Sequence, residues 1–183
     1  MRVTKEKAAE NRQRILKAAA QLIRERGIAG AGVDALAEAA GMTYGSLYSQ
    51  FGSKERLVEE ALEHALVVSG KTMAGAATID QYVAGYLAPE HRDRVGQGCP
   101  RAALACEVPR QGEGVKAAFS AGLKGMIGRL SSRMSPDLTA RQREEQALAT
   151  VASLIGALVL ARAVDDEKLS DSILRATKKQ LTR

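Results

Sequence analysis

Aromatic residues are scarce in this sequence: they make up 3% of it, and tryptophan is absent. The cores of β-sandwiches and β-barrels depend on aromatic and β-branched side chains, so this composition argues against both folds. Proline occurs four times and glycine 17 times, which is far from the content of a collagen-like chain or a flexible linker. Apolar residues nevertheless reach 45%, which is enough for a packed core.

The sequence also lacks the marks of a secreted or membrane protein. Two cysteines cannot form a disulfide framework, so we expect a reducing, cytoplasmic environment. The first residues are charged and no apolar stretch follows them, so we expect no secretory signal. The most apolar segment, Ala147 to Ala161, has about fifteen residues, whereas a membrane span needs about twenty. We therefore interpret it as a buried helix and expect no membrane partner.

Positive charge is in excess and is concentrated at one end. Lysine and arginine together number 27 against 21 aspartates and glutamates, which gives a net charge of +6. Most of the excess lies in residues 1–26, where eight basic side chains accompany three acidic ones. A basic segment favours a polyanionic partner, although many basic proteins bind nothing acidic.

Apolar residues recur at helical spacing along the chain and predict an all-α protein of about nine helices. The expected helices cover about 4–26, 33–40, 44–50, 54 to the mid-seventies, 78–88, 100–108, 113–134, 139–163 and 165–181. Gly27 is expected to end the first helix, and residues 88–98 are expected to form a loop. We place the boundary between an N-terminal domain, residues 1–66, and a C-terminal body, residues 67–183, inside the fourth helix.

Two short helices joined by a tight turn at Gly41 follow the basic first helix, an order typical of a helix-turn-helix domain. In the second of them, Tyr44 to Gln50, Leu47 is expected to pack inward, and Phe51 just beyond it is expected to be a core side chain. The major groove of DNA admits one helix. The other side chains of this helix, Ser46 among them, are therefore expected to contact DNA.

The run from Val33 to Leu57 closely resembles the signature of the TetR/AcrR family of bacterial transcriptional repressors. Its most specific part is the pattern Gly-x-x-x-Gly-x-Leu-Tyr-x-x-Phe-x-x-Lys at residues 41–54. The resemblance implies a DNA-binding regulator, expected to be a repressor, that binds a palindromic operator as a homodimer and is released by a small-molecule effector.

Residue roles follow from the same resemblance. It implies that Thr43, Tyr44 and Gly45 approach bases or nearby phosphates, and that Tyr48, Ser49 and Lys54 hold phosphates. Two positions depart from the family pattern. Gly32 stands where a threonine or serine often caps the second helix, and Tyr44 stands where a basic or small residue is usual, so the operator cannot be copied from relatives.

The body is expected to dimerise and to enclose the effector. The resemblance implies that the last two helices form a four-helix bundle between subunits, with candidate interface residues Val151, Leu154, Ile155, Leu158 and Ile173. An ordinary core within one chain is the alternative and applies in part. Candidate residues for an apolar effector pocket are Tyr82, Tyr86, Leu104, Phe119, Leu123, Met126 and Ile127, and plain core packing is the alternative for each.

The two cysteines suggest a second kind of signal. Cys99 precedes Pro100 at an expected helix start, where the helix dipole stabilises a thiolate, so it is a candidate sensor of electrophiles or oxidants. Seven residues along a helix separate Cys99 from Cys106 by about 10 Å. That exceeds the ~7 Å limit between disulfide-linked Cα atoms, so no internal bridge is expected. Two small buried hydrophobic side chains are the alternative.

No pattern of catalytic residues is visible. The two histidines, His64 and His91, are far apart and lack the spacing of a metal or triad site. No glycine motif for phosphate binding occurs. We therefore expect no enzyme activity, metal or cofactor. A helical protein-interaction module remains the alternative from a different class.

Overall fold

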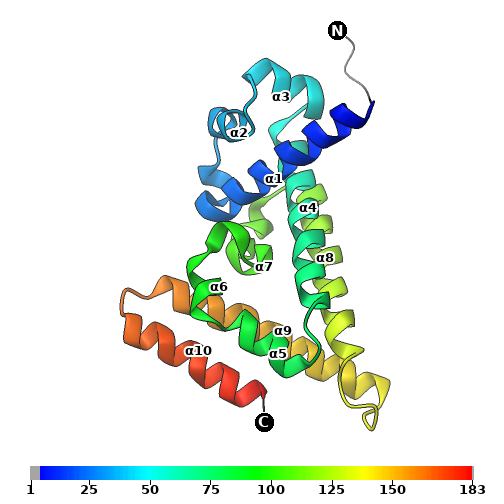
Figure 1. The fold of residues 1–183 in the computed structure, drawn as a ribbon, viewed down its shortest axis with the longest axis vertical. Helices are drawn as coiled ribbons and strands as arrows, with labels where there is room; N and C mark the ends of the chain where they lie inside the picture. The colour runs from blue at the N-terminus through cyan, green and yellow to red at the C-terminus, as the bar shows by residue number, and fades with distance from the viewer. Residues whose placement is uncertain (1–4, 183) are drawn as a thin grey trace.

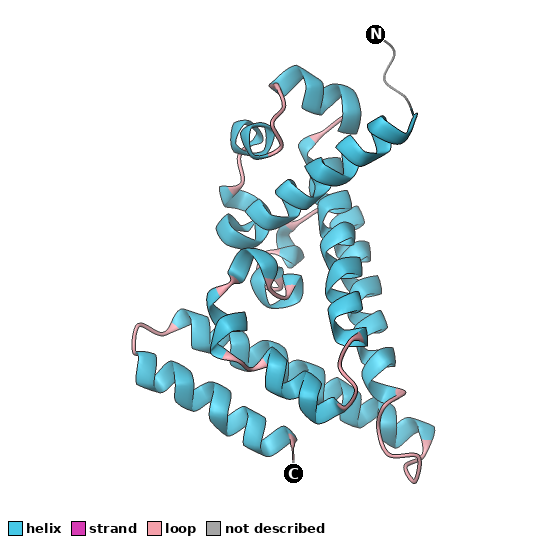
Figure 2. Cartoon of the chain, viewed as in Figure 1, coloured by secondary structure: helices cyan, strands magenta, loops and turns pink. Residues whose placement is uncertain are grey.

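The computed structural model describes residues 5–182, which form ten α-helices and two short 3-10 turns (Figures 1 and 2). No strand occurs within those residues. This confirms the all-α fold predicted from the sequence and comes within one helix of the predicted count.

The helices are α1 (Lys5–Gly30), α2 (Val33–Ala39), α3 (Tyr44–Phe51), α4 (Lys54–Ala74), α5 (Ile79–Tyr86), α6 (Pro89–Asp93), α7 (Pro100–Leu104), α8 (Glu113–Ser131), α9 (Ala140–Ala163) and α10 (Glu167–Leu181). The turns are η1 (Val95–Gln97) and η2 (Val108–Arg110). The expected loop at 88–98 is wrong in part, because Pro89 starts the short helix α6. Proline suits a first helical position, where its missing N–H is not needed.

Gly27 interrupts α1 instead of ending it. Its φ of 75° lies in the left-handed region, and the chain continues as a short turn to Gly30. The Glu107 carboxylate fills the space that a side chain at position 27 would occupy. Glu107 also accepts a hydrogen bond of 3.0 Å from the Ala29 N–H. Gly27 thus turns the chain and lets a residue from the body approach α1.

The turn between α2 and α3 is set by Gly41, which has a φ of 64°. Its N–H donates to the Glu38 carbonyl at 2.9 Å, and the Met42 N–H donates to the Ala37 carbonyl at 2.8 Å. This pair of bonds closes the end of α2, because it satisfies carbonyls that have no partner within the helix. The next helix starts at once, so α3 is held at a fixed angle to α2.

Two hydrophobic clusters form the interior. The first joins α1–α4 and continues into α7 and α8 through Leu104, Val115 and Ala118. The second joins α5, α8, α9 and α10 and includes Cys99. The division of the chain after residue 66 stays a prediction, since the first cluster runs across it.

Helix α9 is long and apolar enough to cross a membrane when judged by length and composition alone. One side of it is buried in the second cluster, and α10 lies antiparallel beside it (Figure 1). Core helices of globular proteins pass the same test. The packing therefore supports the interpretation of this segment as a core helix.

Candidate nucleic-acid interface and ligand cavity

Helix α3 lies at one end of the molecule and turns its polar side to solvent (Figure 1). Tyr44 is 55% exposed, and Gly45, Ser46 and Ser49 are exposed as well. Leu47 and Phe51 are buried in the first cluster, which confirms the two core assignments made from the sequence. The helix therefore offers one uninterrupted polar face.

Local hydrogen bonds and stacking hold that face in place. The Thr43 hydroxyl accepts a hydrogen bond of 3.2 Å from the Ser46 N–H, so it caps α3. The rings of Tyr44 and Tyr48 lie 4.7 Å apart between centroids. The neighbouring Tyr44 hydroxyl raises the pKa of Tyr48 above its ordinary value, so this phenol stays protonated and able to donate a hydrogen bond.

The basic side chains near α3 differ in how they are engaged. The Arg12 guanidinium lies 4.4 Å from the centroid of the Phe51 ring and pairs with Glu60. Arg12 therefore ties α1 to α3 and α4. Lys54 is half-buried and lines a groove beside Ile28 and Val115. Its predicted contact with phosphate remains a prediction.

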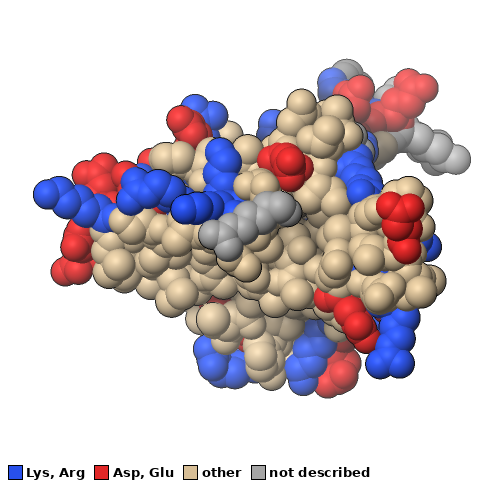
Figure 3. Space-filling view, turned by 90° about the horizontal axis from the view of Figure 1, so that it is seen from below, with Lys and Arg blue, Asp and Glu red and all other residues tan. Residues whose placement is uncertain are grey.

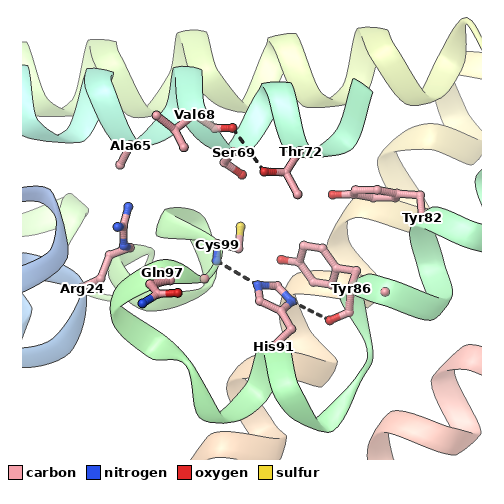
Figure 4. A pocket seen from close by; sticks show the side chains of 12 residues that line it. Arg24, Ala65, Val68, Ser69, Thr72, Tyr82, Tyr86, His91, Gln97 and Cys99 are labelled. Atoms are coloured by element: carbon pink, nitrogen blue, oxygen red, sulfur yellow. Dashed lines mark hydrogen bonds between the residues drawn. The ribbon is translucent and has the colours of Figure 1, made fainter. Parts of the chain in front are cut away.

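A cavity of about 240 Å³ lies between the N-terminal helices and the body (Figure 4). Four helices, one turn and the residues just before α7 contribute to its wall: α1, α4, α5, α6, η1, Gly98 and Cys99. The lining residues are Arg24, Ala65, Val68, Ser69, Thr72, Tyr82, Gly85, Tyr86, His91, Gln97, Gly98 and Cys99. The cavity is small and has several hydroxyl groups, so it suits a compact polar ligand.

Two of the seven predicted pocket residues, Tyr82 and Tyr86, line this cavity. The structure does not bring the other five to it. Leu104 and Met126 are buried in the two clusters, because α7 and α8 turn these side chains towards each cluster's interior. The remaining three, Phe119, Leu123 and Ile127, pack against those clusters.

His91 holds the cavity wall together. Its Nδ1 atom lies 2.6 Å from the Tyr86 carbonyl, and its Nε2 atom lies 2.9 Å from the Cys99 N–H (Figure 4). A neutral ring that donates through Nδ1 and accepts through Nε2 satisfies both bonds. Burial lowers the pKa of His91, which favours this neutral form. No sequence motif marks His91, so sequence reasoning missed this role.

Two reactive groups face the cavity space below α4, the Tyr86 hydroxyl and the Cys99 sulfur (Figure 4). The Tyr86 hydroxyl is buried and has no hydrogen-bond partner among the described residues. Burial raises the pKa of Tyr86 well above its ordinary value, so the phenol is neutral. Cys99 is buried, whereas Cys106 is exposed, so the two cysteines lie in different environments.

Arg24 connects the cavity to the N-terminal domain. This residue of α1 donates from Nε to the Gly96 carbonyl at 2.6 Å. Burial lowers the pKa of Arg24. A ligand in the cavity therefore touches the same helix that supports α2 and α3.

The predicted interface residues divide into two groups. Val151, Leu154 and Leu158 are buried inside the chain's own second cluster, because α9 packs this side against α8 and α10. They are therefore core side chains of this chain, and their contact with a partner remains a prediction. Ile155 and Ile173 are only half-buried and remain on the surface.

A second, exposed apolar face follows α9 and α10. It comprises exposed Leu148 and Ala152 of α9, half-buried Ile155 and Val159 of the same helix, and exposed Leu169 of α10. Leu148 and Leu169 are 47% and 48% exposed. Figure 3 views the end of the molecule where these helices lie and shows a broad uncharged area with charged side chains mostly along its edges.

The N-terminal helices resemble known proteins in sequence. A model of the bacterial regulatory proteins of the tetR family matches residues 15–61. The HTH-type transcriptional regulator TtgR of Pseudomonas putida is 40% identical over 63 residues. The probable HTH-type transcriptional regulator ArpR of the same species is also 40% identical over 63 residues. Each match covers 34% of this chain, and the chain spans only 30% of the length of these relatives.

Solved structures resemble the whole chain. The reduced form of E. coli NemR has a TM-score of 0.77 at 23% identity and covers 94% of this chain and 95% of its own. A TetR regulator from Chloroflexus aurantiacus has a TM-score of 0.78 at 21% identity, with 97% of each chain covered. At these identities the likeness shows the fold.

The matched segment and the shared fold define an all-helical chain whose residues 15–61 resemble the DNA-binding segment of bacterial regulatory proteins. Residues 15–61 are therefore similar to the tetR family of bacterial regulatory proteins, and the whole chain has the fold of the solved TetR-family structures.

Proposed function

We propose that the protein binds operator DNA as a cytoplasmic homodimer and that a small molecule in the cavity lowers its affinity for the operator. The expected outcome is repression, and the proposal gives the protein no catalytic role. The observation that carries it is the polar face of α3, which is exposed from Tyr44 to Ser46 and anchored underneath by buried Leu47. A helix fixed in this way presents side chains to the major groove.

Dimerisation follows from what one α3 helix can reach. One helix contacts about half of an operator. Two N-terminal domains related by a twofold axis contact half-sites about 34–36 Å apart. We call each N-terminal domain a head. The exposed apolar face of α9 and α10 supports this pairing, because contiguous exposed apolar surface marks contact sites. Within this proposal Ile155 and Ile173 remain interface residues, joined by Leu148, Val159 and Leu169.

DNA binding is tested with duplex fragments from upstream of the protein's own gene in a mobility-shift assay. For about eight phosphates contacted per dimer, the logarithm of affinity should fall with the logarithm of salt concentration with a slope near −7. Tyr44→Ala should weaken binding about tenfold or more, because it removes a groove contact without disturbing the core. Val67→Ala is the matched control, since Val67 is 60% exposed but lies on α4.

The dimer is tested by charge substitution on α9. Ile155→Glu should give monomers in analytical ultracentrifugation, because it places a carboxylate within the apolar face. Leu160→Glu is the control, since Leu160 is 57% exposed on the same helix but outside that face. A strictly monomeric unmodified protein that ignores every duplex tested would refute the proposal.

The effector should be small and polar rather than purely apolar. The unpartnered Tyr86 hydroxyl needs an acceptor, and the Arg24 guanidinium favours an electronegative group. A ligand that contacts both Arg24 and α4 would favour one angle between the N-terminal domain and the body over others. Such a ligand lowers operator affinity by favouring a body shape that changes the separation of the two heads.

Two measurements test this mechanism. A crystal structure of the protein as purified should show electron density for a bound molecule beside Tyr86 and Arg24, which would give the effector's chemical class. Spin labels on the two heads should then report a changed separation when that molecule is added. An effector that releases DNA while the separation stays constant would refute the mechanism. Tyr86→Phe should weaken its binding, since the donated hydrogen bond is lost.

A second candidate signal is an electrophile, and the specific observation for it is the Cys99 sulfur at the cavity wall. Addition of the thiol to an activated carbon–carbon double bond forms one S–C bond and transfers the thiol proton to the adduct. Cys99→Ser should abolish release of DNA by N-ethylmaleimide, whereas Cys106→Ser should leave it intact. Equal release from both variants would exclude Cys99.

A further inference from the structure

Two arginines of the body lie near each other without a carboxylate. Arg101 is 1% exposed, and its only hydrogen bond recorded within residues 5–182 runs from a terminal nitrogen to the Gly122 carbonyl at 2.6 Å. Its Nε atom is buried and has no partner. The Nε atom of Arg129 is also buried without a partner. No ion pair involves either side chain in the part of the chain that the structure describes.

This arrangement is costly in the free protein. A buried charge is stabilised only when it is paired and its donors are satisfied. Burial and the charge of nearby Arg101 lower the pKa of Arg129, so the two guanidiniums disfavour each other. Arg92 shows the usual solution elsewhere in the body, because it pairs with Asp93 and Asp171, each at 2.7 Å.

The fold places the Arg129 guanidinium in a gap that glycines leave open. A side chain at Gly70 of α4 would begin 3.2 Å from this guanidinium, and one at Gly125 of α8 would begin 3.3 Å from it. A Cβ atom at Gly122 would collide with Leu66, which lets α4 and α8 approach closely. The charge is therefore accommodated between two helices by the absence of side chains.

Both arginines line one groove between α4 and α8, with a volume of about 610 Å³. Its remaining wall is mainly apolar and includes Leu66, Val67, Ala118 and Ala121. Lys71 adds a third cation. Glu63 is the one acidic residue of the lining, and it is exposed. It lies about 10 Å along α4 from Gly70, the position next to the Arg129 guanidinium. The groove therefore combines an uncompensated positive end with an apolar wall.

We propose that this groove binds a small organic carboxylate, whose anionic group pairs with Arg101 and Arg129 and whose apolar part lies along α4 and α8. Guanidinium groups bind carboxylates through parallel, charge-assisted hydrogen bonds, and a carboxylate here would compensate the two positive charges. The apolar wall favours a carboxylate with a hydrocarbon body over a bare inorganic anion. The site is separate from the cavity at Arg24 and Tyr86, which is lined by Ala65, Val68, Ser69 and Thr72 of α4.

Calorimetry on the full-length protein tests this proposal without DNA. The probe is decanoate, and the matched control is decanamide, which has the same chain but no charge. Decanoate should bind at one site per chain with a dissociation constant below about 1 mM. Decanamide should bind about tenfold or more weakly, because a hydrogen bond to a charged group is stronger than one to a neutral group. Phosphate should compete poorly.

Substitutions then locate the bound probe. Arg129→Met and Arg101→Met should each weaken decanoate binding about ten- to hundredfold, which is the affinity ratio expected for a lost charged hydrogen bond. Lys124→Met removes an exposed cation of α8 outside the groove and should leave binding unchanged. Arg24→Met should also leave it unchanged, which separates this site from the effector cavity.

Several outcomes would overturn the proposal. These are an absence of decanoate binding, equal affinity for decanamide, or unchanged affinity in Arg129→Met. Loss of binding in Arg24→Met alone would assign the probe to the other cavity and would overturn it too. If Arg101→Met fails to fold, Arg129→Met carries the test, because Arg129 is only half-buried.

Discussion

One arginine of the N-terminal helices and two arginines of the body are held in opposite ways. In the N-terminal helices, Arg12 lies over the Phe51 ring and pairs with Glu60, so its charge serves to join three helices. In the body, Arg101 and Arg129 are at least partly buried and lack an acidic partner among the described residues. A satisfied charge supports structure, whereas an unsatisfied buried one points to a missing ligand.

The two halves also differ in how their sites are assembled. The face of α3 is one continuous stretch of sequence, so its geometry follows from a single helix and its cap. The cavity collects side chains from positions as distant as Arg24 and Cys99. The first kind of site depends on local structure and the second on tertiary packing. Four predictions test how independent the two halves are.

The largest effects should come from one leucine in each cluster. Leu47→Ala and Leu154→Ala each remove a side chain that is 0% exposed, so each should lower the free energy of unfolding by about 2–5 kcal/mol. Leu47→Ala should abolish operator binding while the body stays dimeric. Leu154→Ala should weaken the dimer. Urea denaturation measures the free energy of unfolding of each variant, and ultracentrifugation measures its dimerisation. A loss of dimer in Leu47→Ala would contradict the division into halves.

The next effect compares two arginines of the body. Arg162 donates to the Arg92 carbonyl at 2.9 Å and to the His91 carbonyl at 2.8 Å, so Arg162→Met should lower the free energy of unfolding by about 1.5–3 kcal/mol. Arg101→Met should lower it less, because Arg101 donates to a single carbonyl, that of Gly122, and the apolar side chain also removes an unpaired charge. Denaturant titration compares them, and equal destabilisation would mean that Arg101 is compensated.

Two glycines with positive φ, Gly27 inside α1 and Gly41 after α2, sharpen the contrast between local and long-range packing. Alanine in the left-handed region costs about 1–2 kcal/mol, and this should be the whole effect of Gly41→Ala, since no atom lies within 4 Å of a side chain there. Gly27→Ala should cost more, because it also displaces Glu107 from α1. Adding Glu107→Ala should recover part of the difference in thermal unfolding. Identical costs at both glycines would contradict this contact.

The smallest effect is a pH dependence from His91. Burial lowers its pKa in the folded state below the value of about 6.5 expected when unfolded. As the pH falls below about 6.5, the unfolded chain therefore takes up a proton that the folded chain does not, and stability declines. His91→Gln should flatten this decline. Burial also lowers the pKa of His64, so part of the decline in stability with falling pH should remain in His91→Gln. His64→Gln should remove that part. A decline unchanged in both variants would require another titrating group.

The sequence by itself determined most of the helices and the helix-turn-helix formed by α2 and α3. Periodic apolar residues, Gly41 with its left-handed turn and the buried Leu47 act within a few residues of each other, so their pattern is readable along the chain. Helix α6 was missed because Pro89, Gly96 and Gly98 indicated a loop, whereas Pro89 stands at the first position of the helix.

Tertiary structure alone decided which side chains meet. Whether Leu154 faces its own core or a partner, and whether Leu104 reaches a cavity, depends on how helices rotate when they pack, and both side chains proved to be buried. The neutral ring of His91 and the unpaired charge of Arg101 likewise arise only when distant segments come together. Burial and partner choice are properties of the assembled fold, which no local pattern records.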